Sequence, residues 1–97
     1  MTKFQMLIAE LKFCAVHLIM KDGTEKVVTL YSELCHYAVP ENANEQTPIT
    51  TVCLKHGKDG KAEVCGKFVF LFEDIESFHA IKLDKDNFYL DSITCYD

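Results

Sequence analysis

Apolar residues at the start of the chain recur at helical spacing. They stand at positions i, i+3, i+4 and i+7 of one run: Phe4, Leu7, Ile8 and Leu11. Thr2 and Gln5 have the spacing of a capping box, in which each side chain bonds the backbone N–H of the other residue. The pattern predicts an amphipathic helix over residues 2–12, with its apolar face toward the core.

After this segment the pattern becomes typical of β-strands. An unbroken apolar run covers residues 13–20, and Asp22-Gly23 follows it. Asp-Gly between apolar segments is a strong β-hairpin signal, so residues 25–31 are expected to return as a second strand. Because the first strand is apolar on both faces, we expect it to lie inside the sheet and to be covered on both sides.

The middle of the chain predicts a second helix, a loop and a second hairpin. Ser32 can cap a short helix that Pro40 ends. Residues 41–48 are polar and without periodicity, as in a loop. Residues 49–55 and 62–72 then flank a turn. The Phe-Val-Phe-Leu-Phe block that ends the second of these segments is expected to be the most buried strand of the protein.

The last quarter of the chain predicts a third hairpin. Residues 73–76 suit a helical turn with acids at its N-terminal end. Residues 79–83 and 88–96 then flank a turn at 84–87. Since the final strand is expected to lie at a sheet edge, it could pair across a two-fold axis, and the sequence leaves a homodimer and a monomer equally open.

Together these elements predict one compact α+β domain over residues 1–97. Its sheet is expected to be mostly antiparallel, with about six strands in three hairpins, and able to curl toward a small barrel. The N-terminal amphipathic helix and the second short helix complete the domain. No apolar run approaches the ~20 residues of a membrane-spanning helix, and the first residues lack the pattern of a signal peptide. We therefore expect a cytoplasmic protein without a membrane partner.

Charge is distributed unevenly along the chain. The net charge is −5, all ten cations are lysines, and arginine and tryptophan are absent. Residues 73–97 hold seven acids and two lysines, whereas the rest of the chain is balanced. Arginine is the side chain that binds phosphates and guanine bidentately, so its absence argues against a nucleic-acid partner, while the acidic quarter favours a protein partner with a basic surface. The candidate partner-binding residues are the acids and tyrosines of this quarter: Glu73, Asp74, Glu76, Asp84, Asp86, Asp91, Tyr89 and Tyr96.

The cysteines and histidines give little indication of catalysis or metal binding. Five cysteines are scattered through mostly apolar segments, as expected for reduced thiols that fill a core. Cys14-x-x-His17 and Cys53-x-x-His56 have the ligand spacing of zinc sites, but residues i and i+3 of a strand point to opposite faces. The sequence contains no complete motif of a nucleophilic, phosphate-binding or calcium-binding site. We expect no enzyme activity, no cofactor and no metal ion, and a small thiol or zinc protein is left as an alternative.

Two short segments resemble the Sm-like family of small barrels. Leu18-Ile19-Met20-Lys21-Asp22-Gly23 is similar to the first strand and turn of that family, and Val64-Cys65-Gly66 is similar to its short second motif. The aspartate and asparagine of the family's first motif have no counterpart in this chain, and Cys65 stands where the family has a basic residue. The resemblance implies a small barrel that binds RNA.

The leading functional expectation is a small acidic interaction protein or inhibitor that occupies the surface of a partner protein. The composition, rich in lysine and phenylalanine and without arginine, also suits an AT-rich coding source such as a phage or a mobile element. In that setting we expect an anti-defence or host-takeover protein in the cytoplasm of the host cell. The alternative is an Sm-like or small-barrel module that binds single-stranded nucleic acid through the lysines of the second predicted hairpin: Lys55, Lys58, Lys61 and Lys67.

Overall fold

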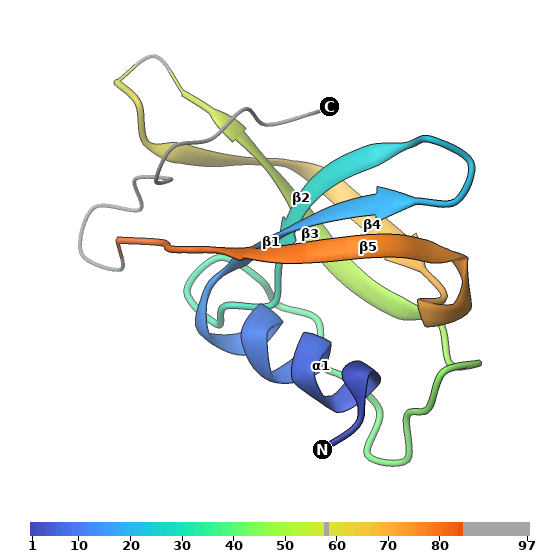
Figure 1. Cartoon of the computed structure of the whole chain (residues 1–97). Helices are drawn as coiled ribbons and strands as arrows, with labels where there is room; N and C mark the ends of the chain where they lie inside the picture. The colour runs from blue at the N-terminus through green and yellow to red at the C-terminus, as the bar shows by residue number, and fades with distance from the viewer. Residues whose placement is uncertain (58, 85–97) are drawn as a thin grey trace.

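The computed structural model describes residues 1–57 and 59–84. They form, in chain order, α1 (Lys3–Phe13), β1 (Ala15–Met20), β2 (Glu25–Thr29), β3 (Ile49–His56), β4 (Ala62–Phe70), the 3-10 turn η1 (Phe72–Asp74) and β5 (Ile75–Ile81). The strands make one antiparallel sheet with the order β4-β3-β2-β1-β5 (Figure 1). The predicted α+β class is confirmed. Within the described residues β4 and β5 remain the two edges of the sheet, which is therefore not closed into a barrel.

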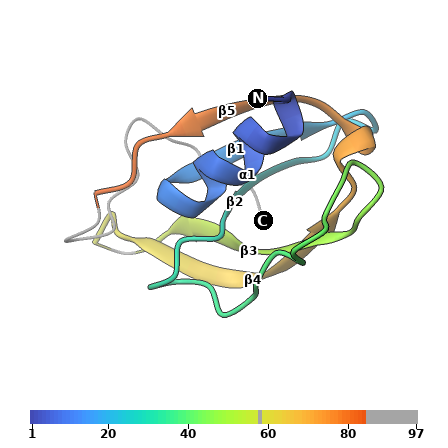
Figure 2. The ribbon, with the colours of Figure 1, turned by 90° about the horizontal axis from the view of Figure 1, so that it is seen from below.

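Helix α1 begins at the predicted capping box. The Gln5 N–H donates to Thr2 Oγ1 (3.1 Å), and the Thr2 N–H donates to Gln5 Oε1 (2.8 Å). Leu7 and Leu11 are fully buried, and the Phe4 ring meets Phe72 edge to face at 5.6 Å. The helix thus packs across one face of the sheet, with β1 and β5 on one side of it and β3 and β4 on the other (Figure 2).

Strand β1 lies inside the sheet between β2 and β5, as its sequence predicts. Val16, Leu18 and Met20 belong to the core cluster beneath α1. Ala15 points to the opposite face, where it packs in a second cluster with Val27, Leu54 and Leu83. The face of β1 beneath α1 is therefore buried, and the opposite face is buried at Ala15 and half-buried at His17 and Ile19.

The turn between β1 and β2 follows from its Asp-Gly sequence. Gly23 has a backbone φ of +90°, which residues other than glycine rarely adopt. The Gly23 N–H donates to the Met20 carbonyl oxygen (3.0 Å), and the Thr24 N–H donates to Asp22 Oδ1 (2.9 Å). The predicted first hairpin is confirmed.

Strand β4 corrects the expectation that its aromatic block would be the most buried strand. Phe70 is 4% exposed, but Val69 is 48% exposed, and every residue from 63 to 67 is exposed. The reason is its place in the sheet. Only β3 pairs with β4 in the described part of the chain, and the helix covers one face, so side chains that point away from the core stay in solvent.

The predicted second helix is also wrong. The N–H groups of Leu34 and Cys35 both donate to the Tyr31 carbonyl oxygen (2.9 Å each), which makes one turn, and the chain then runs irregularly to Pro40. Fewer than ten residues between Ser32 and Pro40 are too short to form a helix without a packed face, and most of the side chains from 36 to 40 are exposed.

The acidic segment that follows β4 forms η1, and β5 begins directly after it. Residues 79–83 of the predicted third hairpin belong mainly to β5, which pairs with β1. The returning strand at 88–96, and with it the sixth strand and the proposed dimer edge, lies outside the described residues. No helix in the described chain is long and apolar enough to cross a membrane.

Candidate functional site

The pairing of β5 with β1 brings two distant segments together at one end of the sheet. Met20, the last residue of β1, aligns with Ile75, the first residue of β5. One residue further on, the Lys21 N–H donates to the carbonyl oxygen of Asp74 (2.9 Å). The β1–β2 turn and η1 are therefore held side by side, although about fifty residues separate them in sequence (Figure 1).

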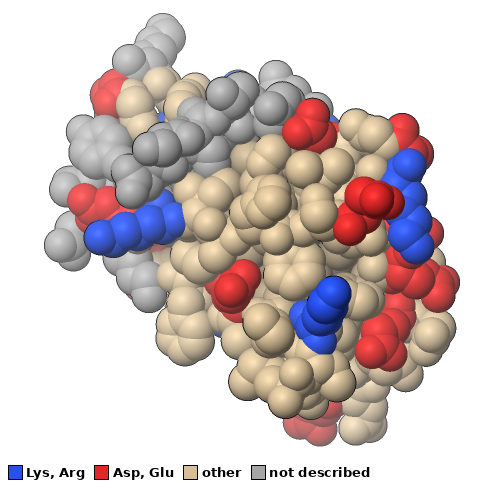
Figure 3. Space-filling view, viewed as in Figure 1, with Lys and Arg blue, Asp and Glu red and all other residues tan. Residues whose placement is uncertain are grey.

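Exposed carboxylates gather where these segments meet. Asp22 comes from the turn, and Glu73 and Asp74 come from η1. In the space-filling view, acidic side chains line this side of the molecule, at the right, with lysine interspersed (Figure 3). The Thr24 backbone N–H, and secondarily its hydroxyl, hold the pKa of Asp22 below its ordinary value of 3.8. We call these three residues the acidic end.

A surface cavity of about 660 Å³ opens beside the acidic end. Its apolar floor is made by Met20 of β1 and by Phe68 and Phe70 of β4, whose rings are stacked with centroids 6.2 Å apart and planes 25° apart. Met20 and Phe70 are buried in the core cluster, so the floor is held by the packing of the domain itself.

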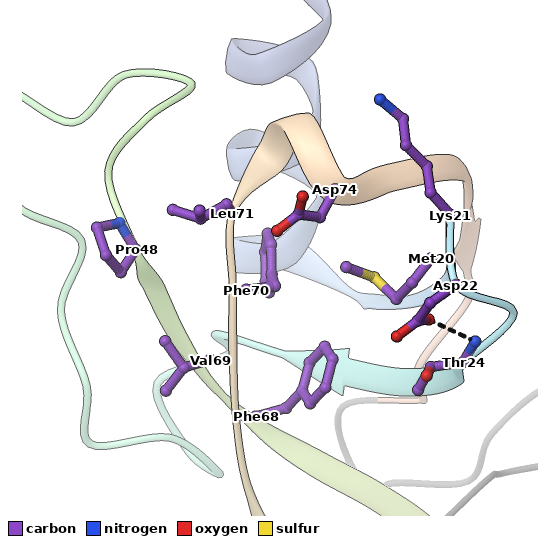
Figure 4. A pocket seen from close by; sticks show the side chains of 10 residues that line it. All are labelled: Met20, Lys21, Asp22, Thr24, Pro48, Phe68, Val69, Phe70, Leu71 and Asp74. Carbon is purple, nitrogen blue, oxygen red and sulfur yellow. Dashed lines mark hydrogen bonds between the residues drawn. The ribbon is translucent and has the colours of Figure 1, made fainter.

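Charged side chains form part of the rim of this cavity. The carboxylates of Asp22 and Asp74 point toward the cavity from two sides, whereas the side chain of Lys21 extends away from it (Figure 4). The polar side chains of the lining are Lys21, Asp22, Thr24 and Asp74. The arrangement is suited to holding a ligand by apolar contact and negative charge.

The structure unites some of the predicted partner-binding residues and separates others. Glu73 and Asp74 lie at the acidic end, and Glu76 follows on β5, where it lines a neighbouring pocket with Lys3. Asp84 lies beyond the opposite end of β5. The remaining predicted residues lie outside the described part of the chain: Asp86, Asp91, Tyr89 and Tyr96.

Sequence reasoning missed Asp22 as a member of this site. Its local signal, Asp followed by Gly, indicates only a turn. Its proximity to Asp74 depends on the pairing of β1 with β5, which no local pattern specifies. The apolar floor was missed for the same reason, because Met20 and Phe68 come from strands that are not neighbours in the sheet.

The lysines of the alternative nucleic-acid site lie elsewhere. Lys55, Lys61 and Lys67 are exposed on the β3–β4 hairpin, and Lys58 lies outside the described residues. Lys55 is the cross-strand partner of Glu63, which offsets its charge. Lys67 and Phe68 are adjacent in β4 and so point to opposite faces, which separates the lysine from the aromatic floor.

The cysteine and histidine pairs with zinc-like spacing do not assemble. Among the residues that the structure describes, no three cysteine, histidine, aspartate or glutamate side chains form a group that could hold a metal ion. Cys14 donates from Sγ to the Glu10 carbonyl oxygen, Cys53 is buried, and His17 bonds Glu25 Oε1 through Nε2 at 3.1 Å. The His79 ring of β5 lies 5.9 Å from that of His17.

Comparison with known proteins assigns no relative to this chain. No family model, no curated protein and no solved structure matches it. The likeness to Sm-like proteins therefore rests only on the short segments at 18–23 and 64–66. A function has to be argued from the geometry of the acidic end and its cavity.

Proposed function

We propose that this protein is a small acidic interaction protein that inhibits or redirects a partner protein by binding to a basic surface of that partner. The observation that supports this proposal is the acidic end, where Asp22 and Asp74 line an apolar cavity and Glu73 lies next to Asp74 in η1. Apolar area contributes affinity on burial, and the surrounding charges select a partner of opposite sign.

The electrostatic part of the proposal has a direct consequence for binding. Charges on the surface are screened over about 8 Å at physiological ionic strength, so neighbouring carboxylates act on the same partner surface. Binding should weaken as salt is added, and the association rate should fall more than the lifetime of the complex.

The proposed setting is the cytoplasm of a cell that a phage or mobile element has entered, where the partner belongs to host or defence machinery. This setting is motivated by composition alone: lysine supplies every cation, and arginine is absent. The protein acts by occupying a surface, with no catalytic step.

The test is affinity capture from such cells with a matched pair of charge variants. The first variant is Asp22→Asn, Glu73→Gln, Asp74→Asn. The control is Glu33→Gln, Glu41→Gln, Glu63→Gln, which neutralises the same number of exposed acids away from the cavity. We expect wild type and control to retain the same captured protein and the first variant to lose it. Equal capture by both variants would overturn the proposal.

Single-stranded nucleic acid is the alternative ligand. A gel shift with short single-stranded RNA and DNA at low salt tests it, with Lys55→Ala, Lys61→Ala, Lys67→Ala as the variant. A shift that this variant abolishes would favour the nucleic-acid module over the acidic interaction protein.

A further inference from the structure

We infer that the cavity beside the acidic end is a socket for an arginine side chain that the partner protein presents. The inference rests on the proposed function, because it names the group by which a basic partner would be recognised. It is carried by the combination of an apolar aromatic floor and two carboxylates that point toward the cavity (Figure 4).

The floor suits the apolar part of such a side chain. Arginine carries a methylene stem that packs on apolar surface while its charged head stays at a polar rim. Phe68 is half-buried and offers the accessible surface for this contact, and Met20 and Phe70, which are buried in the core, support it from below. The cavity, at about 660 Å³, also has the size of sites that hold small ligands, which leaves room for the backbone of the presenting segment.

The rim suits the charged part. Asp22 and Asp74 supply carboxylates from two sides, and the nearest lysine of the lining, Lys21, points away (Figure 4). The bond from the Thr24 N–H orients the Asp22 carboxylate and lowers its pKa. A cation that enters between the two carboxylates gains charge-assisted hydrogen bonds to both.

Several features favour arginine over lysine. A guanidinium is planar, so it can stack on an aromatic face, and it presents several donors in a fixed fork. The half-buried ring of Phe68 supplies the aromatic surface of this cavity, and the carboxylates of Asp22 and Asp74 supply the acceptors, so the two properties are matched. Lysine offers one compact charge and no plane. Because this chain contains no arginine, a second copy of it cannot supply the proposed side chain.

The test uses blocked pentapeptides of glycine with one central residue: arginine, lysine, citrulline or norleucine. Citrulline keeps the shape of arginine without its charge, and norleucine keeps only an apolar stem. Binding is followed by amide chemical shifts of the isotope-labelled wild-type protein. We expect the arginine peptide to produce saturable shifts at residues 20–24 and 68–74, the lysine peptide to bind several-fold more weakly, and the other two to produce no saturable shift.

Two variants locate the binding. The double variant Asp22→Asn, Asp74→Asn should bind the arginine peptide about tenfold or more weakly, since it lacks both charged acceptors. Phe68→Ala should also weaken binding of the arginine peptide. The amide spectrum of that variant reports whether the fold is retained. The matched control, Glu33→Gln, Glu41→Gln, should bind as wild type. Shifts that map to another surface, equal binding of lysine and arginine, or unchanged binding by the Asp22, Asp74 variant would each overturn the arginine socket.

The same variants separate this inference from the proposed function. If a folded Phe68→Ala protein captures the cellular partner as wild type does, while the triple charge variant of the acidic end loses it, the arginine socket fails and the acidic interaction protein stands. If neither variant affects capture, both fail. If both variants lose capture of the partner and also lose binding of the arginine peptide, the arginine socket and the acidic interaction protein are both supported.

Discussion

Strands β1 and β4 look alike in sequence but differ in burial. Each is a largely apolar segment with residues that could face a core on both sides. In the structure β1 lies between two strands, with one face buried and the other buried or half-buried, whereas β4 lies at the edge and buries only one side of its aromatic block. The difference teaches that burial in this protein is decided by sheet order, which depends on contacts between distant parts of the chain.

Strands β1 and β4 both contribute residues to the cavity. β1 ends in Met20, which the core holds, and β4 contributes Phe68 and Phe70 from an edge whose other face is open. The binding surface therefore combines two residues that the core holds, Met20 and Phe70, with Phe68, which is half-buried.

The largest expected effect lies within β4 itself. Phe70→Ala should lower the free energy of unfolding by about 3–5 kcal/mol, because it removes a buried ring from the core. Val69→Ala, one residue away and pointing to solvent, should change it by less than about 0.5–1 kcal/mol. Urea unfolding of both variants measures the difference. Similar losses from the two substitutions would mean that β4 is covered on both faces.

The next effect tests whether β1 is packed at Ala15, on the face opposite α1. Ala15 is fully buried and packs against Val27 and Leu54 on the face opposite α1. Ala15→Leu should destabilise the fold by about 1–3 kcal/mol through overpacking. Cys65→Leu, on the exposed part of β4, is the control and should be tolerated. A stable Ala15→Leu protein in urea unfolding would show that this face has room and is not a packed core.

Local patterns predicted those parts of the fold that local interactions determine. The capping box of Thr2 and Gln5 and the Asp22-Gly23 turn both formed as expected, because each depends on residues within four positions of one another. The second helix failed because a segment that short needs a packed face, which its exposed residues do not provide. The acidic end was predicted only in part, since Glu73 and Asp74 stand in the acidic quarter but Asp22 joins them through the β1–β5 pairing.

A smaller effect concerns a side-chain hydrogen bond that adds to the backbone pairing of β3 with β4. Thr51 of β3 is fully buried, and its hydroxyl donates to the Phe68 carbonyl oxygen (2.9 Å). Thr51→Val keeps the shape but loses this bond, which should cost about 0.5–1.5 kcal/mol in urea unfolding. Amide exchange should accelerate more in β4 than in β1, because the lost bond is local to the edge. Equal acceleration in both strands would contradict a local role.

The smallest expected effect is at the turn that ends β1. The pKa of the Asp22 carboxyl is held below its ordinary value of 3.8, chiefly by the Thr24 N–H that donates to it. A carboxyl whose pKa is lower in the folded chain than in the unfolded chain stabilises the fold while it is ionised. That contribution is fully present well above pH 3.8 and is lost as the pH falls through the folded pKa.

Wild type should therefore lose stability relative to Asp22→Asn as the pH is lowered from about 6 to below 3. Urea midpoints of the two proteins, measured across this range at constant ionic strength, give the comparison. Because Asp22 is exposed the difference should be small, and a difference that stays constant with pH would mean that the Asp22–Thr24 bond does not depend on the charge of the carboxylate.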